Sequence, residues 1–126
     1  MTLNLVTGGA GFVGRHLVRA LEDAGERVRS FDLAGGVCDE EVVGSVTDPA
    51  AAARATEGVD AIFHLAGNAQ LWARDPSVFD RVNRGGTEVM LEAAKKAGVR
   101  RFVHCSSLTT LVGKKTPKRA SASNEA

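Results

Sequence analysis

The chain has 126 residues, 44% apolar and 25% charged, which fits one globular domain. Residues 1–113 hold 12 Lys/Arg and 14 Asp/Glu, whereas residues 114–126 hold four Lys/Arg and one Glu, so the body carries no electrostatic footprint for nucleic acid. No apolar run approaches the roughly twenty residues of a membrane span, and no secretory signal is present. We therefore expect a cytoplasmic protein with no nucleic-acid or membrane partner, in which residues 114–126 form a basic mobile tail.

The N-terminal segment predicts one strand followed by one helix. Residues 3–7 (LNLVT) form a short β-rich apolar run, typical of a buried strand. Residues 12–24 then place Val13, Leu17 and Leu21 at four-residue intervals, which indicates the apolar face of an amphipathic helix.

The next segment predicts two strands and a second helix. Residues 28–33 indicate the second strand, and residues 41–44 indicate a weaker third. Asp48 is placed to cap free N–H groups at a helix start, and Pro49 fits the first helical position because it has no N–H to lose. We expect this Ala-rich helix to end at Gly58.

Two further strands flank a longer helix. Residues 61–65 and 101–105 predict the fourth and fifth strands, and residues 76–97 predict the helix between them. The apolar face expected on this helix comprises Val82, Val89, Ala93 and Ala97. The glycines expected to end the three helices are Gly25, Gly58 and Gly98. Alternating strands and helices predict an α/β fold, a doubly wound parallel sheet of about five strands in the order 3-2-1-4-5.

A glycine-rich segment joins the first strand to the first helix. Gly8, Gly11 and Gly14 form G-x-x-G-x-x-G, a spacing variant of the dinucleotide-binding fingerprint. We expect Gly8 to permit a tight turn, Gly11 to let a pyrophosphate approach the backbone, and Gly14 to let the helix pack close to the strand. The pyrophosphate would then lie on free N–H groups at the helix N-terminus, so Phe12 and Val13 join the expected cofactor contacts.

An acidic residue ends the second predicted strand. Asp32 follows Gly11 by 21 positions, where a carboxylate accepts hydrogen bonds from the adenosine ribose hydroxyls and repels a 2′-phosphate. The following residues 33–36 (LAGG) offer no cation to compensate a phosphate, although Arg15 is placed to reach one. The sequence therefore favours NAD as the cofactor over NADP.

Four motifs in order resemble one known family. They are residues 7–14 (TGGAGFVG) with His16-Leu17, residues 64–67 (HLAG), Asn83 with Gly86-Thr87, and residues 102–107 (FVHCSS). Together they resemble the N-terminal part of the extended short-chain dehydrogenases/reductases, the NAD-dependent epimerase/dehydratase family, which implies a Rossmann fold. Residues 71–76 (LWARDP) are similar to the dihydroflavonol-reductase-like branch, which includes hopanoid-associated sugar epimerases.

The resemblance implies further cofactor contacts. Leu65, Ala66 and Gly67 would line the pyrophosphate and ribose, and Asn83 would bridge helix and strand near the active site. The family usually has an acidic and then an aliphatic residue after its third strand. This chain has Ser45-Val46 there, so Val46 would pack on the adenine while Ser45 would offer only a weaker hydroxyl contact.

The resemblance also implies catalytic positions. Ser107 aligns with the family's catalytic Ser/Thr, which hydrogen-bonds the substrate hydroxyl or carbonyl. Ser106 is the alternative if the alignment shifts by one, and Thr109 would face the substrate. The family's general acid/base is the Tyr of Tyr-x-x-x-Lys, but this chain contains no Tyr.

The remaining candidates are expected to be structural. Cys38 and Cys105 form no CxxC motif and have no His at metal-ligand spacing, so we expect structural thiols, a reducing compartment and no metal. His64 and His104 lie in apolar strand patterns and are interpreted as core residues. The pair Gly85-Gly86 predicts close approach of another backbone or of a ligand.

Two functional hypotheses follow. In the first, residues 1–113 are the incomplete, C-terminally truncated NAD(P)-binding domain of an oxidoreductase or epimerase. The parent enzyme would act by hydride transfer on a secondary alcohol or ketone of a sugar or polycyclic small molecule, and this chain alone would be inactive. In the second, the chain is a non-catalytic dinucleotide-binding module, either a redox sensor or a scaffold that acts with a partner chain. In a variant of this hypothesis, the partner chain supplies the missing Tyr and Lys. In either case we expect self-association through an exposed edge or face of the sheet.

Overall fold

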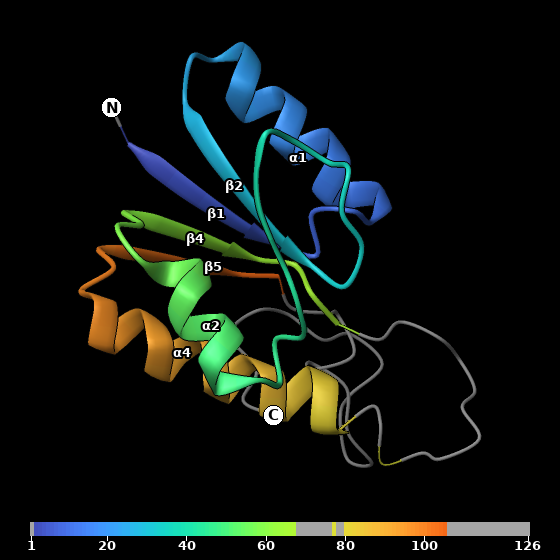
Figure 1. Cartoon of the computed structure of the whole chain (residues 1–126), viewed down its shortest axis with the longest axis vertical. Helices are drawn as coiled ribbons and strands as arrows, with labels where there is room; N and C mark the ends of the chain where they lie inside the picture. The colour runs from blue at the N-terminus through green and yellow to red at the C-terminus, as the bar shows by residue number, and fades with distance from the viewer. Residues whose placement is uncertain (1, 68–76, 78–79, 106–126) are drawn as a thin grey trace, which may run out of the picture.

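A computed structural model describes residues 2–67, 77 and 80–105 of the chain. Its elements are β1 (Leu3–Thr7), α1 (Phe12–Asp23), β2 (Arg27–Asp32), β3 (Glu40–Val43), α2 (Pro49–Thr56), β4 (Ala61–His64), the π-helical turn η1 (Asp80–Gly85), α4 (Gly86–Ala97) and β5 (Arg101–His104). The strands form one parallel sheet in the order β3-β2-β1-β4-β5, as the sequence predicts (Figure 1). Each observed strand boundary lies within one residue of its expected position.

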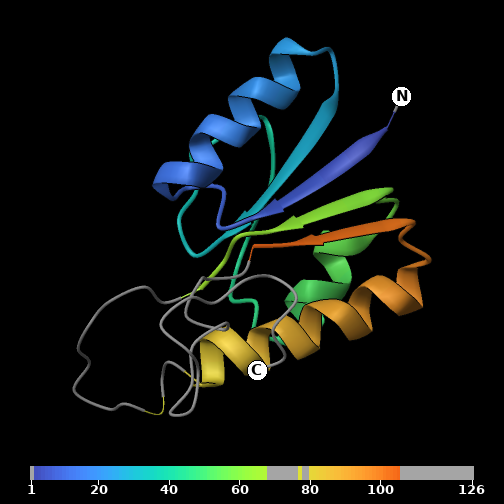
Figure 2. The ribbon, with the colours of Figure 1, turned by 180° about the vertical axis from the view of Figure 1, so that it is seen from behind.

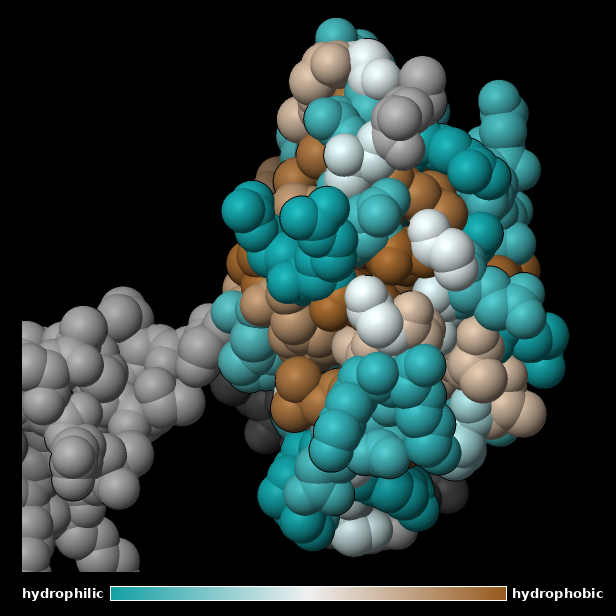
Figure 3. Space-filling view, turned by 90° about the vertical axis from the view of Figure 1, so that its left-hand side faces the viewer, coloured by the Kyte–Doolittle hydropathy of each residue, from teal (hydrophilic) through white to brown (hydrophobic). Residues whose placement is uncertain are grey.

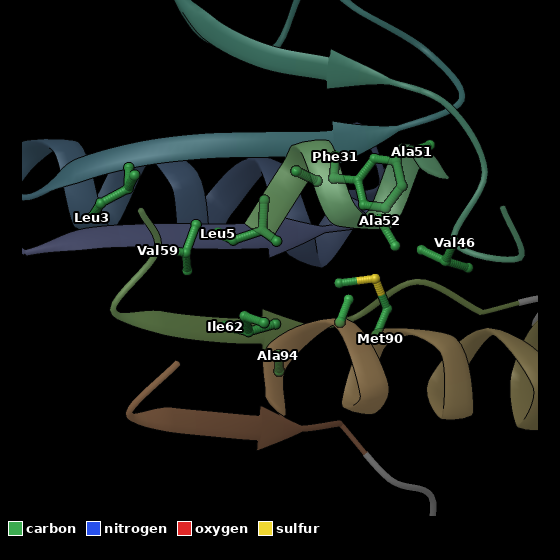
Figure 4. Packing of buried hydrophobic residues seen from close by; sticks show 12 residues of the cluster. Leu3, Leu5, Phe31, Val46, Ala51, Ala52, Val59, Ile62, Met90 and Ala94 are labelled. Carbon is green, nitrogen blue, oxygen red and sulfur yellow. The ribbon is translucent and has the colours of Figure 1, made fainter. Parts of the chain in front are cut away.

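The sheet is the middle of three layers. Helix α1 covers one face over β1 and β2, and α2 and α4 lie side by side on the other face (Figures 1 and 2). The larger core lies beneath α2 and α4, where Leu5, Phe31 and Met90 are fully buried (Figure 4). Strand β1 is buried along its whole length because it lies in the centre of the sheet and both of its faces are covered.

Local signals set the ends of the helices. The Asp48 carboxylate accepts a hydrogen bond of 3.0 Å from the Ala50 N–H, and Pro49 opens α2, as expected. Gly25, Gly58 and Gly98 all have positive φ, which confirms the three predicted helix-ending positions.

Arg29 fastens the end of α2 to the sheet. Its Nη1 donates to the carbonyl oxygens of Ala55 and Glu57, at 2.7 Å each. Its Nε and Nη2 donate to Glu40 Oε1 on β3, at 3.1 and 2.8 Å. Partial burial raises the pKa of Glu40, but the hydrogen bonds and charges of Arg29 and Arg27 outweigh this effect and hold the pKa below its ordinary value. One partly buried cation thus serves both a helix C-terminus and a strand.

Two expected helix faces are confirmed only in part. On α1 the predicted Leu17 and Leu21 pack against the core beside the buried Val18, whereas Val13 is 60% exposed. On α4 the predicted Ala93 is buried, together with Met90 and Ala94, and Val89 packs against the core, whereas Ala97 is exposed. Periodicity predicts that a helix has an apolar stripe, but the rotation of the helix depends on what it packs against.

Strand β5 lies at the edge of the described sheet. Val103 is 41% exposed, and both His104 and Cys105 are exposed, so the interpretation of those two residues as buried and structural was wrong. An apolar strand pattern predicts burial only where both faces are covered.

On one face of the molecule, apolar patches alternate with polar side chains (Figure 3). Among the described residues, every helix is too short or too polar to span a bilayer.

We expect Arg29→Met to lower the free energy of unfolding by about 2 kcal/mol, because two helix carbonyls and Glu40 lose a charged donor. Arg27→Met is the matched control: it removes the other partner of Glu40, but the Arg27 side chain is 54% exposed, so we expect a loss below about 0.5 kcal/mol. Urea denaturation of both variants measures the difference. Equal losses would contradict the assigned role of Arg29.

Candidate cofactor site

A cleft of about 230 Å³ lies at the carboxyl ends of the strands. Four segments and η1 line it: Gly8 and Gly11 from the glycine turn, Phe31, Asp32 and Leu33 from the end of β2, Gly44, Ser45 and Val46 after β3, Leu65, Ala66 and Gly67 after β4, and Val82. In the order β3-β2-β1-β4-β5, successive strands are added on one side of β1 up to β3 and on the other side from β4 onward. Open α/β sheets bind ligands at this switch point, between β1 and β4. The structure therefore brings most of the predicted cofactor residues together at the expected edge.

The glycine turn is packed on both sides by backbone. Gly8 has a φ of +70°, and a Cβ there would lie 3.0 Å from the Ala66 nitrogen. A Cβ on Gly14 would collide with the Gly8 carbonyl oxygen and lie 2.8 Å from the Gly9 Cα. Gly14 thus lets α1 pack closely against Gly8 and Gly9, the two residues that directly follow β1.

The N-terminus of α1 offers an anion site. Gly11 is the N-cap residue and makes no side-chain hydrogen bond, so the first N–H groups of the helix have no cap. A Cβ on Gly11 would approach only the Gly8 carbonyl oxygen, at 3.3 Å, which leaves the backbone open toward the cleft. The side chains of Phe12 and Val13 are 82% and 60% exposed and do not line the cleft, so only their backbone N–H groups can face a ligand there.

Asp32 is held in place with capacity to spare. Its Oδ2 accepts from the Ala10 N–H at 3.0 Å, and its Oδ1 accepts from the Ala34 N–H at 3.2 Å. Each carboxylate oxygen keeps a further lone pair, so both can still accept a ribose hydroxyl. The Arg15 Nε–H donates to the Ala10 carbonyl oxygen at 2.8 Å, and Arg15 does not line the cleft.

Residues after β3 form an apolar wall. Val46 is buried and packs so closely on α4 that a Cβ on Gly86 would lie 2.7 Å from its Cγ2. The close approach predicted for Gly85-Gly86 is thus found at Gly86. The Ser45 hydroxyl lies 2.7 Å from Thr47 Oγ1, so it is already paired locally. Leu33 lines the cleft while 74% exposed; no pattern in the sequence indicated it, apart from its position after Asp32.

The fourth wall combines the end of β4 with η1. The N–H groups of Leu65 and Ala66 donate to Thr7 Oγ1 at 3.1 and 3.0 Å. A Cβ on Gly67 would lie 3.0 Å from Asn83 Oδ1, so the Asn83 amide lies against the backbone of the cleft, between helix and strand. Thr7 has no place in the glycine fingerprint, but as the last inward residue of β1 it reaches the neighbouring loop.

His64 is a core residue, as predicted. It is 1% exposed, and burial together with the nearby His104 lowers its pKa to about 4, so the imidazole is neutral at physiological pH. Ser106, Ser107, Thr109 and residues 71–76 and 114–126 lie outside the described residues. Within the described part of the chain, no three His, Cys, Asp or Glu side chains form a metal cluster.

A larger hollow of about 560 Å³ runs between α2 and α4. Its lining comes from helix side chains, including Ala53, Val89 and Ala93, and it reaches none of the strand ends. Its carboxylates, Glu57, Glu88 and Glu92, lie at or on helices rather than at the end of a strand, and the helix N-terminus at Pro49 is already capped by Asp48. The cleft at the strand ends, which combines an uncapped helix N-terminus with Asp32, is therefore the candidate cofactor site.

Comparison with known proteins gives a consistent result. The profile of the NAD dependent epimerase/dehydratase family matches residues 4–126. A 3 beta-hydroxysteroid dehydrogenase/Delta 5-->4-isomerase of Mycobacterium tuberculosis is 45% identical over 121 residues, which cover 86% of this chain and 32% of that protein. A putative dihydroflavonol 4-reductase of Synechocystis sp. is 36% identical over 125 residues, covering 94% and 36%. The chain thus spans about a third of the length of these relatives.

A solved structure is similar to this chain in both fold and sequence. A short-chain dehydrogenase/reductase superfamily protein from Agrobacterium tumefaciens, crystallised with bound NAD, superposes with a TM-score of 0.82 at 40% identity. The match covers 95% of this chain and 40% of that protein.

We expect substitution by alanine to affect stability at Gly14, the third residue of α1, and NAD binding at Gly11, its N-cap. Gly14→Ala forces a Cβ into the backbone of Gly8 and Gly9, so the free energy of unfolding should fall by more than about 2 kcal/mol. Gly11→Ala fits its extended backbone and should change stability by less than about 1 kcal/mol, while the methyl group blocks the approach of an anion. Thermal unfolding and NAD titration measure both effects. A stable Gly14→Ala variant would contradict the packing described.

Proposed function

The chain belongs to the NAD dependent epimerase/dehydratase family, and from that membership we propose that its strand-end cleft binds NAD. The observation that carries the proposal is the pairing of an uncapped helix N-terminus with the Asp32 carboxylate across one cleft. The first suits a pyrophosphate and the second suits ribose hydroxyls. Gly11 leaves the backbone open between them.

NAD fits this cleft better than NADP does. A 2′-phosphate would lie beside the Asp32 carboxylate, and Arg15 donates to Ala10 rather than into the cleft. The adenine would rest against Val46 and Leu33, with little polar contact from Ser45, whose hydroxyl is already paired.

The whole enzyme would oxidise or reduce a secondary alcohol or ketone of a sugar or polycyclic small molecule. NAD, when bound, supplies the hydride acceptor for such a reaction. This chain's part is to bind the dinucleotide and orient the substrate, with Ser107 or, in a shifted alignment, Ser106 bonding the reacting oxygen and Thr109 beside it. The similarity to a hydroxysteroid dehydrogenase and to a putative dihydroflavonol reductase supports a polycyclic substrate.

The chain on its own would bind cofactor without turnover. It contains no Tyr, so it lacks the phenol that its family uses as general acid/base. A second candidate is a non-catalytic dinucleotide sensor or scaffold that acts with a partner chain. Turnover assays with and without added partner separate these two roles. Residues 1–113 would form the binding domain in both cases, with 114–126 as a basic tail, and the free thiols of Cys38 and Cys105 favour the cytoplasm.

Self-association through β5 is part of the proposal. This strand is the edge of the described sheet and exposes Val103. We expect the molar mass measured by light scattering to rise with concentration, and Val103→Lys to suppress the rise because a charge on an edge strand opposes pairing. A monomer at all concentrations would contradict this part of the proposal.

Asp32→Asn tests the choice of cofactor. Asn keeps the size and one acceptor oxygen but removes the charge that repels a 2′-phosphate, so we expect the ratio of NAD to NADP affinity to fall about tenfold. Asp39→Asn is the matched control, an exposed acid beyond the cleft that should leave the ratio unchanged. Calorimetric titration of wild type and both variants gives the ratios. An unchanged ratio in Asp32→Asn, or a wild type that binds neither dinucleotide, would overturn the assignment.

A further inference from the structure

A chain of hydrogen bonds, buried at Thr7 and exposed at Asn83, connects two walls of the cleft. Thr7 Oγ1 lies 2.8 Å from His64 Nδ1, and His64 Nε2 lies 3.0 Å from Thr87 Oγ1. Thr7 is fully buried and His64 is 1% exposed. Thr87 Oγ1 donates in turn to the Asn83 carbonyl oxygen at 2.6 Å. None of the three side chains lines the cleft.

The Asn83 end of this series of hydrogen bonds fixes which atom donates in each bond. The Asn83 carbonyl can only accept, so the single Thr87 hydroxyl hydrogen points to it, and Thr87 Oγ1 must accept from His64. His64 therefore carries its proton on Nε2 and accepts at Nδ1. The Thr7 hydroxyl then donates to Nδ1.

Both lone pairs of Thr7 Oγ1 are then available to accept hydrogen bonds from the loop after β4. They accept the N–H groups of Leu65 and Ala66, so its hydroxyl makes three hydrogen bonds and has no capacity left. At the other end, Asn83 belongs to η1, which contributes Val82 to the cleft. The chain of bonds thus ties the loop after β4 to η1 through one imidazole.

We propose that neutral His64, oriented by Thr87, is a positioning residue that holds the Leu65–Gly67 loop in its cofactor-binding arrangement. The proposal rests on the proposed function, since it names the groups that keep that site in shape. It assigns His64 no contact with the cofactor and no proton transfer.

Loss of the Thr87 hydroxyl would be transmitted to the cleft. The buried His64 Nε2–H would have no acceptor, which favours moving the proton to Nδ1. Nδ1–H would then compete for a lone pair of Thr7 Oγ1. The Leu65 amide also donates to the Thr7 carbonyl oxygen at 3.3 Å, so the Ala66 amide is the one that would lose its acceptor. A hydroxyl on α4 that does not line the cleft therefore controls the position of a loop that does.

The test compares three threonine variants by calorimetric titration with NAD. Thr87→Val should weaken NAD binding about tenfold, and Thr87→Ser, which keeps the hydroxyl, should stay within about twofold of wild type. Thr56→Val is the matched control: the buried Thr56 hydroxyl also donates to the carbonyl four residues earlier, that of Ala52, but it lies in α2 away from the cleft. It should lower the melting temperature and leave NAD affinity within about twofold. Wild-type affinity in Thr87→Val, or equal losses in all three variants, would overturn the proposal.

A second measurement needs no cofactor. Long-range ¹H–¹⁵N spectra should place the His64 proton on Nε2 in the wild type and in Thr87→Ser, and the Ala66 amide signal should shift in Thr87→Val only. A proton on Nδ1 in the wild type, or an unchanged Ala66 signal in Thr87→Val, would overturn the proposal. If the wild type binds no NAD, the proposed function fails by itself, while these spectra still decide the role of His64.

Discussion

The cleft depends on the contact between two backbone segments that no side chain separates. The turn at Gly8, whose φ is +70°, meets the loop at Ala66 so closely that a Cβ would lie 3.0 Å from the Ala66 nitrogen, and α1 meets the same turn at Gly14. Because β1 and β4 are adjacent and parallel, both segments leave the sheet at the same edge. The helix N-terminus and the strand-end amides are thereby held in place by packing of the main chain, so the candidate cofactor site needs no flexible side chain to form.

The polar interior behind that contact follows the rule that buried polar groups are paired. Thr7, His64 and Thr87 satisfy one another in a fixed direction, and the low pKa of His64 agrees with an imidazole that makes its bonds in the neutral form. Ser30 is the exception: its hydroxyl is buried without a hydrogen-bond partner among the described residues and occupies the space that a Cβ on Gly9 would need. By contrast, the hydroxyls of Thr7 and Thr87 and both ring nitrogens of His64 all have hydrogen-bond partners.

Most of the fold was predictable because its signals are local. The Asp48-Pro49 start of α2, the glycines that end helices and the apolar runs of β1 and β4 each act within a few residues. The predictions for Val13, Ala97, His104 and Cys105 were wrong because burial depends on which neighbours arrive from elsewhere in the chain. Helix rotation and edge position are properties of the assembled sheet, and periodicity does not contain them.

The sequence by itself determined the order of the sheet, the glycine turn and the acidic end of β2, because strand length, glycine spacing and residue type are written along the chain. Only the tertiary structure decided that Gly14 packs on the turn, that Ser45 is already paired with Thr47 and that Thr7 reaches the amides of Leu65 and Ala66. The Ser45–Thr47 contact spans only two residues, but it forms in a loop whose shape no periodic pattern predicts. The Thr7–Ala66 contact spans 59 residues. It exists only once parallel strands bring the loops to one edge, where a hydroxyl on one strand meets the amides that follow another.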